Sequence, residues 1–116
     1  MSTRNWKLRA EDILEAVQNI KTYTDGMSFL TWNEDKKTID AVIRNLEIIG
    51  EAVNHIPTEI QSRYHDIPWQ QMRGIRNILI HEYFGIDKEV IWQTIKNDIP
   101  TLEKMFRRLI EKYWAE

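Results

Sequence analysis

The chain has 116 residues, a formal net charge of −2 and no cysteine. This length suits one domain with a sizeable core and is too short for two independent cores. The lack of cysteine excludes disulfides, thiol catalysis and thiolate metal sites. The slightly acidic balance argues against a broad basic surface for long nucleic acid, and it leaves room for a local basic cleft.

No apolar run follows the N-terminal residues 1–4, and no stretch of about 18 apolar residues occurs that could cross a membrane. We therefore expect a cytoplasmic protein without membrane contact. The three histidines, His55, His65 and His81, lack a helical ligand spacing such as i, i+4. We expect no metal site and no cofactor, and we interpret His55 and His65 as turn and surface residues.

The first predicted helix carries apolar residues on one face at 3.6-residue spacing and should end near Asp25-Gly26. This face consists of Ala10, Ile13, Leu14, Val17 and Ile20. One or two further turns of helix are expected around residues 27–32. A polar connection over residues 33–37 then leads to the next long helix.

The second long helix has the most regular apolar seam in the chain. The seam residues are Ile39, Val42, Leu46, Ile49, Val53 and Ile56. Gly50 costs this helix about 1 kcal/mol relative to alanine, which indicates a close approach by another helix. Pro57 ends the helix, and a short helix over about Thr58 to Tyr64 precedes a longer helix that begins at Pro68.

Gly85 suits the left-handed position just after the Pro68 helix, and Asp87 is a good N-cap for the helix that follows. A last helix is expected after Asp98 and Pro100, with an apolar seam of Ile99, Leu102, Phe106, Leu109 and Tyr113. No segment alternates like a strand. The sequence therefore predicts an all-α fold, an up-and-down bundle of about four main helices with short inserted helices, as one domain over residues 1–116.

One run within the Pro68 helix combines polar residues that a purely structural helix does not need: Arg76-Asn77-Ile78-Leu79-Ile80-His81-Glu82-Tyr83. Arg76 offers a planar fork of donors that suits phosphate oxygens. His81 is of the residue type that exchanges protons near neutral pH. Arg73, Asn77 and His81 share one side of the helix at four-residue spacing. This combination predicts chemistry on a phosphate.

Arg76 and His81 are five residues apart, which corresponds to about 140° around a regular helix. Three arrangements would unite them: a curled arginine side chain, a helix that loosens before His81, or a second copy of the chain. Surplus apolar residues favour the second copy, namely Ile43, Ile48, Ile78 and Ile80. We therefore expect a homodimer with its two-fold axis beside His81.

The second long helix carries a charged stripe beside its apolar seam, made of Asp40, Arg44, Glu47 and Glu51. One interpretation is a solvated face with pairs such as Asp40 to Arg44. The other is that Asp40, Arg44 and Glu47 form a wall of the active cleft.

The run from Arg76 to Tyr83 resembles the R-x4-H-x-Y motif of HepT-like toxins, within the HEPN superfamily. Residues 44–52 resemble the second-helix signature of that family. Pro68-Trp69 is similar to the entry of its motif helix, and residues 83–87 are similar to the exit. The likeness covers most of the chain, so the chain resembles a single HEPN-type helical domain.

The resemblance implies a dimeric, metal-independent ribonuclease that cleaves tRNA or mRNA as the toxin of a toxin–antitoxin pair. His81 would be the general base or acid at the ribose 2′-OH or the leaving 5′-oxygen. Arg76 would stabilise the phosphorane-like transition state, and Asn77 would orient the imidazole or the phosphate. The cognate antitoxin would be a minimal nucleotidyltransferase that transfers AMP to Tyr83.

Two other interpretations of the residues stay open at this point. In the first, the chain is a non-catalytic helical binding subunit of a nucleotidyltransferase complex, and Arg76 and His81 only hold a nucleotide. In the second, the chain is a plain helical bundle with an incidental polar patch. Cleavage of RNA in EDTA, and toxicity on expression alone, distinguish a nuclease from both.

Overall fold

The computed structural model describes the backbone of residues 3–81 and 87–115, and the side chains of residues 6–79 and 87–114. This part of the chain is helical and contains no β-strand. The elements are α1 (Thr3–Thr24), α2 (Phe29–Asn33), α3 (Lys36–Val53), α4 (Thr58–Arg63), α5 (Trp69–His81), α6 (Lys88–Gln93), the π-helix η1 (Thr94–Asp98) and α7 (Ile99–Ala115). The predicted all-α class is confirmed.

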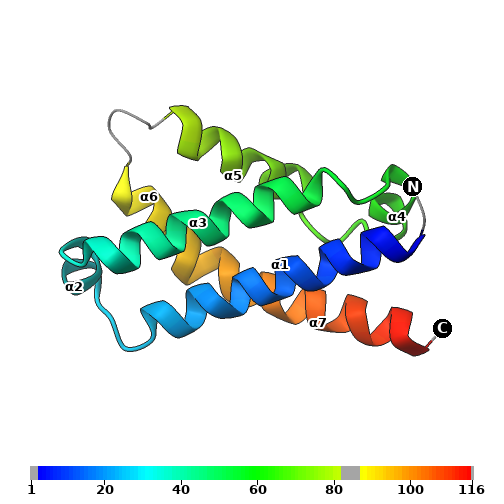
Figure 1. Cartoon of the computed structure of the whole chain (residues 1–116), viewed down its shortest axis with the longest axis horizontal. Coiled ribbons are helices and arrows are strands. Elements are labelled where there is room, and N and C mark those ends of the chain that lie inside the picture. The colour runs from blue at the N-terminus through cyan, green and yellow to red at the C-terminus, as the bar shows by residue number, and fades with distance from the viewer. Residues whose placement is uncertain (1–2, 82–86, 116) are drawn as a thin grey trace.

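The four long helices form an up-and-down bundle (Figure 1). Helices α1 and α3 lie side by side and run in opposite directions, α7 packs against α1, and α5 packs against α3. Helix α5 is thus covered extensively on the flank that faces α3, and the groove described below opens beside this flank. Among the described helices, none is both long and apolar enough to cross a membrane.

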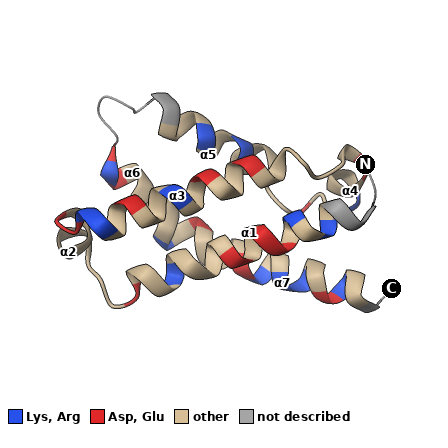
Figure 2. Cartoon of the chain, in the orientation of Figure 1, with Lys and Arg blue, Asp and Glu red and all other residues tan. Residues whose placement is uncertain are grey.

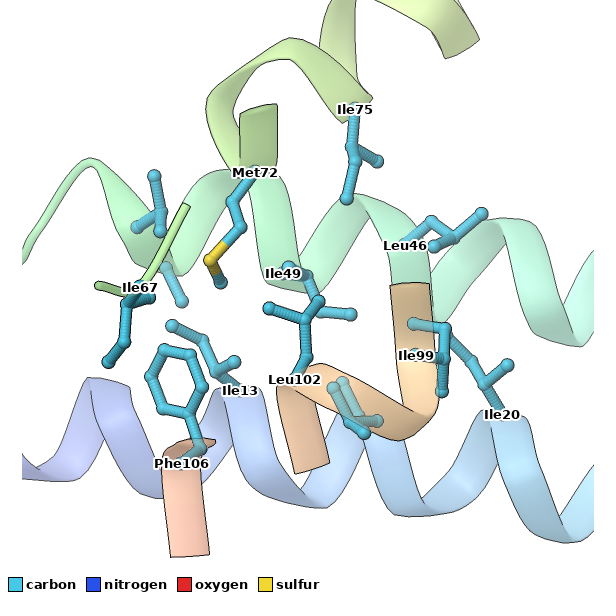
Figure 3. Packing of buried hydrophobic residues seen from close by; sticks show 14 of the residues in the cluster. Ile13, Ile20, Leu46, Ile49, Ile67, Met72, Ile75, Ile99, Leu102 and Phe106 are labelled. Carbon is cyan, nitrogen blue, oxygen red and sulfur yellow. The ribbon is translucent and has the colours of Figure 1, made fainter. Parts of the chain in front are cut away.

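The core lies where the four long helices meet (Figure 3). Ile13 of α1, Ile49 of α3, Met72 of α5 and Phe106 of α7 are all almost fully buried. Every predicted seam residue of the first two long helices is buried except Leu14, which packs at the edge of the core. Burial of such side chains contributes about 1.5–3 kcal/mol each, so the seams determine which helix faces pack together.

Side-chain caps set several of the helix boundaries. The Asp35 carboxylate accepts hydrogen bonds from the Thr38 amide at 3.1 Å and the Thr38 hydroxyl at 2.8 Å, so it caps α3. These two hydrogen bonds hold the pKa of Asp35 below its usual value. Asp87 caps α6 as predicted, because its carboxylate accepts from the amides of Glu89 and Val90.

Two predicted boundaries need correction, and a third prediction is not tested. Helix α3 ends at Val53, so Ile56 is buried in the connection beyond it; Pro57 disfavours a helical residue before it. The short helix α4 ends at Arg63, one residue earlier than predicted. Gly85, assigned to a left-handed position, lies outside the described residues.

The break predicted near Asp98 and Pro100 is not a break. Helix α6 continues through η1 into α7, and the Ile99 amide donates to the Thr94 carbonyl five residues earlier. Proline lacks the amide donor, and its ring would clash with the carbonyl four residues before it in a regular helix. The wider π-turn lets the chain absorb Pro100 without ending the helix.

The close helix approach expected at Gly50 is confirmed. A Cβ atom at Gly50 would lie 3.2 Å from the Cβ of Arg76 and 3.5 Å from its backbone nitrogen. Only glycine allows α3 and α5 to approach this closely here. The crossing point of the two helices therefore fixes where Arg76 leaves the backbone of α5.

Candidate active site

A polar groove of about 830 Å³ opens between α1, α3 and α5, and Arg76 lines it. Figure 2 shows that both acidic and basic residues occur along α1 and α3. The polar side chains from α1 are Arg9, Asp12, Glu15 and Asn19. Those from α3 are Arg44, Asn45, Glu47 and Glu51. The groove thus contains three arginines and four carboxylates, so it is mixed in charge rather than basic.

Arg76 is held over α3 by Glu51. The Arg76 Nη1 atom donates to the Oε2 atom of Glu51 at 3.3 Å, and both side chains are about half exposed (53% and 55%). The Oε1 atom of Glu51 lies 3.6 Å from Nε2 of His55. Exposed ion pairs of this kind contribute little to stability. The pair instead orients Arg76, because Glu51 keeps its guanidinium in the groove.

Two of the three α3 residues predicted for the cleft wall line this groove. Arg44 and Glu47 both do so, with 3.7 Å between Nη1 and Oε2. Asp40 is not among the lining residues. The predicted pair between Asp40 and Arg44 is wrong, because Asp40 accepts a hydrogen bond from Lys36 at 3.1 Å, one turn nearer the start of α3.

The other two supporting residues on α5 do not line the groove. Arg73 donates to the Oε1 atom of Gln61 on α4 at 2.8 Å, which directs its guanidinium toward α4. Asn77 is exposed and is absent from the lining. The structure therefore brings Arg76 together with Arg44 and Glu47, and it leaves Arg73, Asn77 and Asp40 elsewhere.

Helix α5 continues to His81, its last residue. The regular backbone between positions 76 and 81 does not support the arrangement in which the helix loosens before His81. Positions five residues apart in an α-helix differ by about 140° around the axis. The side chain of His81 and the whole of Tyr83 lie outside the described residues.

Sequence reasoning missed partners that only the tertiary structure reveals. Glu51 was recognised as part of the charged stripe, but its pairing with Arg76 depends on the crossing of α3 and α5. Asn45 is 6% exposed, and its side chain accepts a hydrogen bond from Asn19 at 3.2 Å. A signal for Asn45 did exist: it follows Val42 by three residues and precedes Ile49 by four, so it is a polar residue at seam spacing.

Within residues 3–81 and 87–115, as far as their side chains are described, no group of three or more His, Asp or Glu residues is arranged to hold a metal ion. The residues around the groove suit a different task. Arginine donors beside exchangeable carboxylates can receive an anionic oxygen, such as that of a phosphate diester.

Comparison with known proteins places the chain among the ribonucleases. The profile of the ribonuclease HepT-like family matches residues 13–109. Over 106 residues, the chain is 46% identical to the probable ribonuclease HepT of Thermococcus cleftensis, covering 91% of this chain and 96% of that one. The chain belongs to the ribonuclease HepT-like family, as the R-x4-H-x-Y resemblance predicts.

Two further relatives agree in name. RNase MJ0127 of Methanocaldococcus jannaschii, an assignment that its name marks as provisional, is 43% identical over 90% of this chain and 87% of its own. RNase TTE0752 of Caldanaerobacter subterraneus subsp. tengcongensis, whose name is provisional in the same way, is 39% identical over 88% of this chain and 91% of its own. No solved structure matches the chain. The predicted enzyme class, a ribonuclease, is confirmed by the family.

Proposed function

We propose that this chain is a metal-independent endoribonuclease that acts in the cytoplasm as the toxin of a toxin–antitoxin pair. The observation that carries the proposal is the placement of Arg76: Gly50 sets its backbone at the α3–α5 crossing, and Glu51 aims its guanidinium into the groove. His81 follows in the same continuous helix. Family membership supplies the ribonuclease activity, and these residues supply the groups that it requires.

In the proposed reaction, His81 removes the proton from a ribose 2′-OH, and the 2′-oxygen attacks the neighbouring phosphorus. The bond to the 5′-oxygen breaks as that oxygen receives a proton, which leaves a 2′,3′-cyclic phosphate and a 5′-hydroxyl. Arg76 donates to a non-bridging oxygen as negative charge grows in the transition state. The phosphate must displace the carboxylate of Glu51 from Arg76, and an exposed pair is easily exchanged in this way.

A homodimer is part of the proposal, and the free flank of α5 supports it. Gly74 and His81 are seven residues apart, so they share one helix face. A Cβ at Gly74 would meet nothing within 4 Å, so no contact among the described residues requires a glycine there. Ile78 is 37% exposed on the same flank and borders an apolar groove of about 490 Å³ between α5 and the η1–α7 helix. A second copy of α5 that packs at Gly74 would lie beside His81.

Neutralisation by a minimal nucleotidyltransferase completes the proposal. Transfer of AMP to Tyr83, two residues after His81, would add a bulky anion near the catalytic histidine. The added group would exclude RNA by its size and by repulsion of the RNA phosphates. Intact-mass measurement after co-expression with the partner enzyme should show added AMP on the wild-type chain and none on Tyr83→Phe.

The central test is cleavage of defined tRNA and mRNA by purified protein in EDTA. Wild-type protein should cut the RNA and His81→Ala should not, while both show the same helical circular dichroism. His65→Ala is the matched control, because it removes a histidine outside the groove lining and should cut normally. Full activity of His81→Ala would refute the mechanism. If the wild-type protein neither cleaves RNA nor is toxic when expressed alone, the non-catalytic binding subunit is favoured.

A further inference from the structure

The groove around Arg76 does not by itself provide the positive surface that an RNA strand requires. Its lining contains three arginines and four carboxylates, and two of the arginines already pair with carboxylates. RNA binding depends on Lys and Arg contacts to several phosphates. Because the whole chain has a net charge of −2, the missing surface must be a local concentration of basic residues.

Helix α7 carries such a concentration on its exposed side. Lys104, Arg108 and Lys112 follow one another at four-residue steps, so they lie within about 80° around the helix axis and about 6 Å apart along it. We call these three exposed residues the basic row. The Nζ atom of Lys112 lies 5.6 Å from the centre of the Tyr64 ring, a contact that orients the side chain and leaves its charge in place.

The two carboxylates of α7 leave the basic row unpaired among the described residues. Glu103 is largely buried on the other flank, where it accepts from Lys21 of α1 at 2.6 Å and from Arg107 at 3.3 Å. Glu111 is exposed and lies about 60° from Arg108 around the axis, so it weakens the positive charge of this face without cancelling it.

The basic row begins next to the face on which the dimer is proposed to form. Thr101, almost one turn before Lys104, lines the apolar groove that α7 shares with Gly74 of α5. None of the three residues of the basic row lines that groove. A second copy of the chain seated there would therefore leave the basic row beside the proposed site.

We propose that the basic row binds the phosphodiester backbone of the substrate RNA and positions the strand for the site at Arg76 and His81. The proposal rests on the proposed function, because it states how that site holds its substrate. Contacts to phosphates fix the position of a nucleic acid and carry no base preference. They also release counterions, so the binding must weaken as the salt concentration rises.

The test measures binding of a 2′-O-methyl RNA oligonucleotide, which lacks the attacking 2′-OH and so stays intact. Fluorescence anisotropy gives the dissociation constant between about 50 and 200 mM salt. Each lost contact to a single strand lowers the slope of log affinity against log salt by about 0.7, so the triple variant Lys104→Gln, Arg108→Gln and Lys112→Gln should lose about 2. Its affinity deficit should then be roughly 16-fold larger at 50 mM than at 200 mM.

Two single variants sharpen the test. Glu111→Gln removes the negative charge from the same face, so it should bind the RNA more tightly than wild type. Lys37→Gln is the matched control, because Lys37 is an exposed lysine in the first turn of α3, beside α2 (Figure 1), and should retain the affinity and its salt dependence. With cleavable RNA, the triple variant should show a raised KM and the wild-type kcat, because the basic row does not touch the reacting groups.

Wild-type affinity and salt dependence in the triple variant, or an equal loss of affinity in Lys37→Gln, would overturn the basic row as an RNA surface. A loss of affinity with unchanged salt dependence would overturn it too, because the lost contacts would not be to phosphates. Wild-type protein that binds the 2′-O-methyl RNA through the basic row but cuts no unmodified RNA would refute the nuclease proposal and leave the RNA surface standing.

Discussion

Gly50→Ala tests whether the α3–α5 crossing positions the proposed catalytic arginine. The added methyl would lie 3.2 Å from the Cβ of Arg76, 3.5 Å from its nitrogen and 3.7 Å from its Cα. These atoms belong to the root of the residue, so no rotamer change relieves the contact, and α5 must shift by a few tenths of an ångström. Alanine favours the helix by about 1 kcal/mol, and overpacking typically costs about 1–3 kcal/mol. We expect the free energy of unfolding to fall by about 0–2 kcal/mol.

The effect of Gly50→Ala on catalysis should exceed its effect on stability. A misplacement of about 1 Å can cost about 10²-fold in rate, so a smaller shift of Arg76 should cost about 10-fold in RNA cleavage. Urea unfolding and single-turnover cleavage, measured on the same preparation, separate the two effects. For the stability measurement, Gly74→Ala is the matched helical glycine, because its new methyl would meet nothing within 4 Å among the described residues. If Gly50→Ala is as stable as Gly74→Ala and cleaves at the wild-type rate, the crossing does not position Arg76.

Three further predictions concern other contacts. Glu51→Gln should change the free energy of unfolding by less than about 0.5 kcal/mol, since the pair is exposed, and should lower the cleavage rate several-fold because Arg76 loses its orienting charge. The hydrogen bond from Lys21 at 2.6 Å holds the pKa of Glu103 below its usual 4.5. The resulting stability is present above the unfolded-state pKa, near 4.5, and is lost as the pH falls through the lower folded-state pKa. The melting temperature of Glu103→Gln should therefore depend less on pH below about 4.5 than that of wild type. If the two proteins lose stability equally as the pH falls below about 4.5, Glu103 does not contribute in this way. Gly74→Leu should leave the circular dichroism helical while light scattering shows monomers and cleavage is lost; an intact dimer would exclude Gly74 from the interface.

The sequence predicts the fold well because the burial of one helix face and the capping of a helix both depend on residues that are close together in the sequence. The spacing of Ile39, Val42 and Leu46 defines a buried face whatever the partner helix is, and Asp87 needs only the next three residues to act as a cap. The π-helix η1 could not be predicted in this way. Pro100 is equally compatible with a new helix and with a bulge, and the choice depends on burying Ile95 and Ile99 in the same core.

The site is less predictable, because its contacts join residues on different helices. Glu51 and Arg76 are 25 residues apart, and Asn19 and Asn45 are 26 apart. The motif within one helix identified Arg76 as a candidate site residue. The four-residue spacing in the same helix also grouped Arg73 with Asn77 and His81. Only the position of α4 reveals that Gln61 binds Arg73 instead.

The two helical glycines, Gly50 and Gly74, bear on which chain supplies each of the proposed catalytic groups, Arg76 and His81. Gly50 is explained by contact with Arg76. Gly74 lies on the face shared with position 81, and a Cβ atom there would meet nothing within 4 Å among the described residues. If a second copy covers that face, each site combines Arg76 of one chain with His81 of the other. Mixing inactive Arg76→Ala and inactive His81→Ala chains would then form heterodimers with one intact site. Random pairing makes half of the dimers heterodimers, so cleavage should recover to about a quarter of the wild-type rate. Chains that are refolded together and remain inactive, despite verified heterodimers, would place both groups in one chain and require Arg76 to leave Glu51 and curl toward its own His81.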